Sequence, residues 1–167
     1  FYGTRAIWSD FIGADMTRTR FGGTDLMGAD FSDGTFKGTG LWPSDLSLSH
    51  MRNVDRGNGD HQSDLTQSNL FRVVMQGSDF SDASFSFTLM HAASIIDTSF
   101  VDASMGAVDM RLTNRWSARS GDQLDGSQDT GDFSLAWMES SDLRSALLQN
   151  AAFDSTNLQY GDLRGTD

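Results

Sequence analysis

The sequence has no cysteine and only one proline, one lysine and one glutamate. Without cysteine the chain forms no disulfide and offers no thiolate to a metal. The three histidines, His50, His61 and His91, show no metal-ligand spacing. No run is long and apolar enough to span a membrane as a helix, and no nucleophile elbow, P-loop or dinucleotide fingerprint is present. These absences argue against an enzyme, a cofactor-binding protein and a membrane-spanning protein.

The acidic charge comes almost wholly from aspartate. The formal net charge is −11, and Glu139 is the single glutamate among 23 acidic residues. A protein of this sign repels nucleic acid and anionic membranes. We therefore expect no direct binding to nucleic acid, whereas a protein partner that itself binds DNA would be attracted.

A large apolar side chain recurs at every fifth residue over most of the chain. Ten of the twelve phenylalanines stand at these central positions, and the two that do not are Phe71 and Phe87. The residue two places before each centre is always Gly, Ala, Ser, Thr or Val. The centres run in three blocks, from Phe1 to Met51, from Leu65 to Met110 and from Phe133 to Leu163.

A period of five fits neither a helix, which repeats its faces at ~3.6 residues, nor a strand, which repeats at 2. The backbone must therefore turn in every repeat to return the large and the small residue to one inner face. Fixed self-similarity of this kind is typical of a solenoid.

The length of 167 residues predicts a single domain over 1–167. The start at Phe1 has neither Met nor a signal-like pattern, so we expect a processed or trimmed product in the cytoplasm.

The repeat resembles that of the pentapeptide-repeat family, in which a small residue, Asp or Asn, and Leu or Phe follow one another. Gly13-Ala14-Asp15-Met16, Gly28-Ala29-Asp30-Phe31 and Gly77-Ser78-Asp79-Phe80 match it closely. The resemblance implies an all-β fold, a right-handed quadrilateral β-helix of about eight coils with four repeats, or twenty residues, in each coil. Residues twenty apart would then stack at the usual strand spacing of ~4.8 Å.

Aspartates at the position just before the centre should form columns along this solenoid. The spacing of twenty pairs Asp10 with Asp30, and Asp25 with Asp45. One interpretation is local, because an Asp side chain at this position can accept hydrogen bonds from backbone amides of the turn. The other is collective, because rows of carboxylates imitate the regularly spaced phosphates of duplex DNA.

The register breaks in two polar, turn-rich stretches, near 52–63 and near 113–130. We predict that both are loops that project from the coils; the alternative is degenerate repeats that keep the coil with poor side chains. The run Gly57-Asn58-Gly59-Asp60 is faintly similar to a calcium turn. It does not match a full EF-hand loop, so we predict no metal and no cofactor.

Two loops separated by nine intact repeats are similar to the arrangement in Qnr-type quinolone-resistance members of the family, which protect DNA gyrase and topoisomerase IV. This resemblance implies a DNA mimic that binds a type II topoisomerase and protects it from quinolone-like poisons or inhibits it. The chain departs from that group in lacking its dimer-forming C-terminal helix and in having more repeats before the first loop. The candidate partner-binding residues are Asp10, Asp25, Asp30 and Asp45 in the columns, and Asp55, Arg56, Asp60, Asn114, Arg115 and Trp116 at the loops.

A second hypothesis is a structural or scaffolding solenoid that docks a protein partner through a flat face. The register places Trp8, Trp42 and Trp137 outward, and exposed indoles often mark contact surfaces. Binding by mimicry should weaken steeply with added salt, whereas hydrophobic docking should not. The sequence leaves both hypotheses open.

Overall fold

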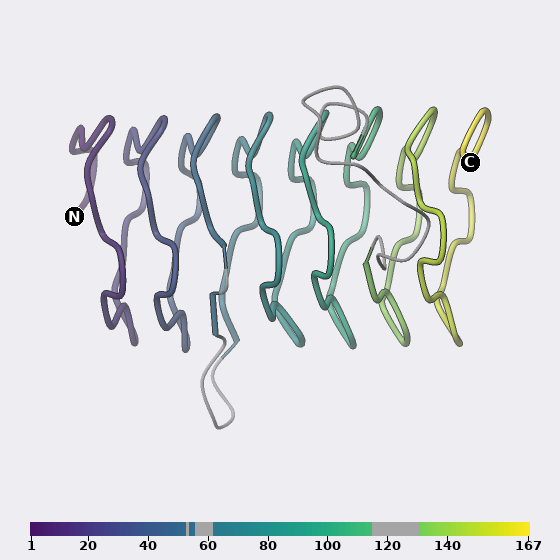
Figure 1. The fold of residues 1–167 in the computed structure, drawn as a ribbon, viewed down its shortest axis with the longest axis horizontal. Coiled ribbons are helices and arrows are strands. Elements are labelled where there is room, and N and C mark those ends of the chain that lie inside the picture. The colour runs from purple at the N-terminus through teal and green to yellow at the C-terminus, as the bar shows by residue number, and fades with distance from the viewer. Residues whose placement is uncertain (53, 56–61, 115–130) are drawn as a thin grey trace.

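The protein is a rod of stacked coils with its two termini at opposite ends (Figure 1). This computed structural model describes residues 1–52, 54–55, 62–114 and 131–167. Over those ranges the backbone forms no helix and no continuous strand, and its regular structure consists of isolated parallel bridges between coils. None of these ranges therefore contains a helix that could cross a membrane. The predicted solenoid is confirmed.

One turn of the coil takes twenty residues. Parallel bridges join residues twenty apart, such as Arg5 with Asp25 and Asp25 with Asp45. Two longer steps accommodate the breaks in the register, where Asp45 pairs with Asn69 and Asp109 pairs with Asp142. The handedness of the coil and its square outline, which the family resemblance implies, stay predictions.

The four bridge positions of each coil define four sides of the rod, which we name A to D in chain order. Side A contains Arg5, Asp25, Asp45, Asn69, Leu89, Asp109, Asp142 and Asp162. Side C contains Asp15, Thr35, Asp55, Asp79, Ser99, Asp132 and Ala152. Side B begins at Asp10 and side D at Arg20. Sides A and C are separated by one side in either direction around the coil, so they lie on opposite flanks of the rod.

The core is a set of ladders made by the central apolar residues of successive coils. Phe100 is fully buried, and its ring stacks on the Phe133 ring with centroids 5.1 Å apart. Phe153 continues the stack on the other face of Phe133, again with centroids 5.1 Å apart. The small residues two places earlier, such as Ala103 and Ala136, are buried beside these ladders. Burial of this apolar surface supplies the main driving force for folding.

Each repeat turns a corner two residues after its centre. The residue there adopts a positive φ in most of the described repeats, as at Gly28 (φ 69°), Gly77 (φ 70°) and Asp102 (φ 57°). Glycine adopts this left-handed conformation freely, and Asp and Asn tolerate it better than other residues. The same corner position holds Phe87 at φ 59°, where a bulky side chain is strained.

Both breaks begin later than the sequence predicts. Val54 is buried as the small residue of one further repeat, and Asp55 forms a bridge with Thr35. Thr113 and Asn114 are likewise buried in the coil. The repeats therefore continue to at least Asp55 and Asn114, and the predicted loops near 52–63 and 113–130 otherwise lie largely outside the described residues.

Candidate interaction surface

The aspartates before the core positions first serve the local turn. Their Oδ1 atoms accept a hydrogen bond from the backbone N–H two residues later, at 2.9 Å for Asp10, Asp30 and Asp45 and at 3.4 Å for Asp25. The local interpretation of these residues is therefore correct. Because the bond uses one carboxylate oxygen, Oδ2 can still face a partner.

The four aspartates predicted to form columns, Asp10, Asp25, Asp30 and Asp45, lie together as two pairs and not as one row. We call these four residues the quartet. Bridges join Asp10 to Asp30 on side B, and Asp25 to Asp45 on side A. Two of the four are also close to a basic group: Asp25 Oδ2 lies 3.5 Å from Arg5 Nε, and Asp30 Oδ2 lies 3.6 Å from His50 Nδ1. Partial burial acts to raise the pKa of Asp30, but hydrogen bonds from Ser32 and the nearby imidazole outweigh it and hold that pKa below its ordinary value.

The part of the chain that contains the quartet is nearly neutral. Residues 1–52 hold six aspartates against five basic residues, a net charge of −1. Residues 62–110 hold six aspartates against Arg72 alone, a net charge of −5. Nearly half of the net charge of −11 therefore belongs to the middle coils.

In the middle and C-terminal coils, carboxylates gather on side C and its two corners. This carboxylate patch consists of Asp79, Asp82, Asp97, Asp102, Asp132 and Asp154. Asp97, Asp102 and Asp154 are exposed and the other three are partly exposed. The described segments that form this surface, 75–82, 95–102, 131–135 and 148–155, contain no Lys or Arg. Asp82 and Asp102, which are twenty residues apart, occupy the same corner of adjacent coils, and the Asp82 N–H donates to the Val101 carbonyl at 2.8 Å.

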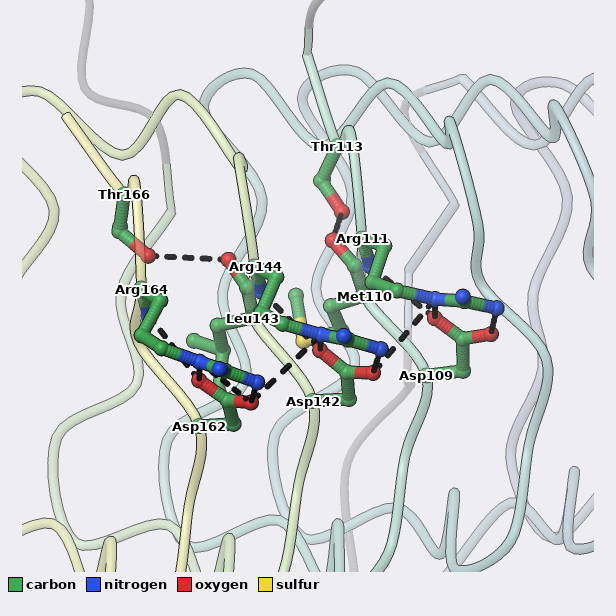
Figure 2. Close-up of polar contacts among 10 residues, drawn as sticks. All are labelled: Asp109, Met110, Arg111, Thr113, Asp142, Leu143, Arg144, Asp162, Arg164 and Thr166. Atoms are coloured by element: carbon green, nitrogen blue, oxygen red, sulfur yellow. Dashed lines mark hydrogen bonds and ion pairs between the residues drawn. The ribbon is translucent and has the colours of Figure 1, made fainter.

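A ladder of ion pairs occupies the C-terminal end of side A (Figure 2). In three successive coils an arginine two residues after the aspartate donates to both of its oxygens: Arg111 to Asp109, Arg144 to Asp142, and Arg164 to Asp162. The coils are also linked to one another. Arg111 Nε lies 3.5 Å from Asp142 Oδ2, and Arg144 Nε lies 3.6 Å from Asp162 Oδ2.

The ladder neutralises its own carboxylates. The hydrogen bond from Arg164 is the main reason that the pKa of Asp162 falls to about 2. The hydrogen bond from Arg144 likewise lowers the pKa of Asp142. Sequence reasoning missed this feature, although the signal is plain in Asp109-Met110-Arg111, Asp142-Leu143-Arg144 and Asp162-Leu163-Arg164. These three aspartates offer little net charge to a partner.

The three tryptophans predicted to point outward are exposed: Trp8 by 66%, Trp42 by 48% and Trp137 by 55%. Trp42 and Tyr2 border a groove of about 460 Å³ along side D. Gly22 and Gly40 also line this groove, and their missing side chains leave room for it. Sequence reasoning did not assign a role to a second exposed apolar group, Phe71, Phe87 and Leu89.

The predicted loop contacts have different outcomes. Asp55 is exposed on side C. Asn114 is fully buried: its Oδ1 accepts from the Ile95 N–H at 2.8 Å and its Nδ2 donates to the Leu147 carbonyl at 3.0 Å. Its amide therefore joins coils inside the fold and is not offered to a partner. Arg56, Asp60, Arg115 and Trp116 lie outside the described residues. Among the residues that the structure describes, no group of three or more His, Asp or Glu side chains could hold a metal ion.

Comparison with known proteins gives one family and several structures. A family model described as pentapeptide repeats matches in eight copies over residues 7–42, 61–86 and 132–167. Rfr23, a pentapeptide repeat protein from the cyanobacterium Cyanothece 51142, is 15% identical, with 70% of this chain and 86% of that chain covered and a TM-score of 0.50. This likeness shows the fold alone.

Two further structures are similar at lower TM-scores. HetL, a pentapeptide repeat protein involved in heterocyst differentiation regulation from the cyanobacterium Nostoc sp. strain PCC 7120, is 18% identical, with 99% of this chain and 90% of that chain covered and a TM-score of 0.42. QnrB1, a plasmid-mediated fluoroquinolone resistance protein, is 17% identical, with 100% of this chain and 84% of that chain covered and a TM-score of 0.42. No curated protein matches the chain.

Proposed function

This chain belongs to the pentapeptide-repeat family, whose model matches more than half of its residues, and from that premise we propose that it works by binding another protein. Proteins of this family are generally structural or interaction proteins without enzymatic activity. The binding surface is the carboxylate patch on side C, and its partner is a protein with a basic surface. Fold alone does not fix this function, so the proposal depends on the patch itself.

The single observation that supports the proposal is the separation of charge between the flanks. On side A the aspartates of the C-terminal coils are matched by arginines. On side C the described segments around Asp97, Asp102 and Asp132 contain no basic residue. A surface of one sign attracts a partner of the opposite sign and speeds their encounter.

The more specific proposal is that the basic surface is the DNA channel of a type II topoisomerase, DNA gyrase or topoisomerase IV. Each of the four coils that form the patch carries at least one of its carboxylates, and successive coils are stacked at roughly 4.8 Å, the strand spacing. These carboxylates resemble the regular negative charge of a DNA strand more closely than scattered surface charges would. The chain would then act as a DNA mimic that protects the enzyme from quinolone-like inhibitors or inhibits it, and it would do so in the cytoplasm.

Two matched variants test this function. One changes Asp97, Asp102, Asp132 and Asp154 to Asn, and the control changes Asp10, Asp25, Asp30 and Asp45 to Asn. Each variant loses four charges, and asparagine keeps an oxygen that can accept the turn hydrogen bond at Asp132 and at the four control positions. We expect the first variant to bind gyrase at least about 10-fold more weakly, a loss of roughly 1.4 kcal/mol, with a much smaller loss for the control.

Competition with duplex DNA is the second readout. Wild-type binding to gyrase should fall as DNA or salt is added, because both weaken the attraction of carboxylates to Lys and Arg in the channel. A larger loss in the control variant would place the binding surface on sides A and B. If gyrase keeps its supercoiling activity and its quinolone sensitivity unchanged in the presence of the wild-type protein, the topoisomerase proposal is wrong.

The second candidate function is a scaffold that docks a partner through exposed aromatic residues. The groove beside Trp42 and the exposed Trp137, both on side D, favour it. Replacing Trp42 and Trp137 with Ser should then abolish capture of the partner, and added salt should not. Salt-resistant binding that depends on these indoles would favour the scaffold over the mimic.

A further inference from the structure

An exposed apolar patch lies on the middle coils, at side A and its two corners, on the flank opposite the carboxylate patch. Phe87 is 63% exposed and Leu89 is 51% exposed, and Phe71 and Leu48 on the two preceding coils are exposed as well. Phe71 and Phe87 are the only phenylalanines outside the core register. We call these four residues the apolar patch.

Three of the four residues are unusual at their positions. On side A the coil before Leu89 has Asn69, whose Oδ1 accepts from the Phe71 N–H at 3.1 Å. A leucine side chain cannot make this turn bond. Phe87 (φ 59°) and Leu48 (φ 61°) occupy corners, where Gly, Asp or Asn would be relaxed. Bulky corner residues with positive φ occur elsewhere in the rod as well, as at Leu135 and Tyr160, so the exposure of the four side chains, and not backbone strain alone, identifies the patch.

From this patch we infer that side A is the contact surface for a second copy of the same chain, with the two rods antiparallel and face to face. A contact of this kind is isologous, because the same patch serves both copies. A stable interface buries roughly 800 Å² on each partner, more than four side chains supply. The charged coils on either side of the patch must therefore take part, and their charges decide the orientation.

The two-fold axis lies between the coil of Asn69 and the coil of Leu89. In the antiparallel arrangement this axis sets the Asp45 coil of one copy against the coil of Asp109 and Arg111 in the other. A parallel arrangement would instead set Asp45 against its own copy. Like charges placed opposite each other weaken an interface, so the antiparallel arrangement is favoured.

The next coils outward follow the same logic. Asp25 of one copy meets the Asp142–Arg144 ion pair of the other, and Arg5 meets the Asp162–Arg164 ion pair. The guanidinium of Arg144 contacts Asp142 through Nε and Nη2, which leaves its Nη1 outside that pair for a carboxylate of the second copy. In a parallel pair, Asp25 would face only Asp25. The carboxylate patch on side C stays uncovered in this dimer, so the inference does not depend on the proposed function.

Sedimentation equilibrium of the full chain tests the dimer. The variant carries Phe87→Gly and Leu89→Asn, which install the residues that the corner and the side A position favour, so we expect it to fold. The wild type should be dimeric, and the variant should have a dissociation constant raised about 30-fold or more, the loss typical of one hot-spot residue. A monomeric wild type, or a variant that dimerises equally well, would overturn the inference.

Trp137→Asn is the matched control. It also removes an exposed apolar side chain from a bridge position, and the next coil already has Asn157 there. Because Trp137 lies on side D, this variant should dimerise as the wild type does. If it loses the dimer while the Phe87→Gly/Leu89→Asn variant keeps it, the contact surface is side D.

Disulfide trapping tests the orientation in a chain that has no cysteine of its own. Pro43→Cys and Ala107→Cys place thiols at the corner between sides D and A, on the coils of Asp45 and Asp109. In the antiparallel dimer these two corners face each other. A mixture of the two variants should form the mixed disulfide under mild oxidation, and neither variant alone should form a disulfide. Disulfides in either variant alone, or none in the mixture, would overturn the antiparallel arrangement.

Discussion

An aspartate before a core residue of this rod divides its two oxygens between two tasks. In Asp132 the Oδ1 atom accepts the Ser134 N–H at 2.9 Å and fixes the turn. Its second oxygen is left for the surface. Asparagine performs the first task equally well, as Asn157 shows by accepting the Gln159 N–H at 3.0 Å. Charge and folding are therefore separable at these positions.

Substitutions at Asp132 should show this separation. Asp132→Asn keeps the acceptor, so the free energy of unfolding should stay within about 0.5 kcal/mol of the wild type. Asp132→Ala leaves the Ser134 N–H without its acceptor and should cost about 1 kcal/mol. Urea unfolding of both variants measures the difference. Equal losses in the two variants would mean that the charge, and not the turn bond, is what stabilises the fold.

At the scale of one element, the ladder on side A turns three separate Asp-x-Arg units into a continuous structure. Arginines of the ladder pair with the carboxylate of their own coil and lie near the carboxylate of the next coil, as Arg144 does with Asp142 and Asp162. Exposed ion pairs contribute little one by one, and more when several form a network. We infer that the ladder holds together the three coils that carry Asp109, Asp142 and Asp162.

The ladder should make stability depend on pH at the acid end. The pKa of Asp162 is about 2 in the fold against 3.8 for an ordinary aspartate, because Arg164 donates to its ionised form. A depressed carboxyl pKa adds stability above the unfolded pKa and loses it as the pH falls through the folded value. For this residue the loss runs from about 3.8 down to about 2.

Arg164→Gln isolates this contribution. Because it removes the main cause of the depressed pKa, the variant should be less stable than the wild type at neutral pH. The difference in unfolding free energy between the variant and the wild type should shrink as the pH falls from about 3.8 to about 2, since the Asp162 carboxyl then loses its charge in both proteins. Urea unfolding across an acid pH series measures it. A gap that persists unchanged at the acid end would mean that the arginine acts through packing alone.

The sequence predicts the coil well because one short rule repeats. Every centre from Leu65 to Met110 is buried, as the five-residue period requires. The ends of the repeat blocks are less visible, because Val54 and Thr113 fit the small position while the centres that follow them, Arg56 and Arg115, do not look like core residues. The candidate interaction surface is harder to predict from the sequence than the ends of the repeat blocks. Charge on side C depends on corner residues such as Asp97, which the column argument leaves out.

At the scale of the whole molecule, the two flanks of the rod differ in chemistry. Side C and its corners hold carboxylates such as Asp97 and Asp102 without basic neighbours in the described segments. Side A holds the apolar patch and the ion-pair ladder. A solenoid can separate these properties because each residue of the repeat returns to the same side every twenty residues. One flank is thus suited to a basic partner and the other to a second copy.

A rod of this kind should open from its ends. In a solenoid each coil contacts only its neighbours, so an end coil has one stabilising interface and a middle coil has two. Burial follows this order: Phe85 and Met90 are fully buried, whereas Phe1 and Leu163 are exposed. Hydrogen-bond length does not distinguish the coils, since Phe11 N–H and Phe85 N–H both donate to the next coil at 2.7 Å.

Hydrogen exchange can therefore separate fraying from global unfolding. We expect the Phe11 amide to exchange much faster than the Phe85 amide, because local opening at an end requires less free energy than opening in the middle. The Phe87→Gly/Leu89→Asn variant is the right sample, because self-association would otherwise add protection to side A. Protection should rise from both ends towards the coils of Met75 and Met90. Uniform protection along the rod would mean that the coils unfold as one cooperative unit, and a minimum beside residues 62–65 would mean that the first break divides the rod into two such units.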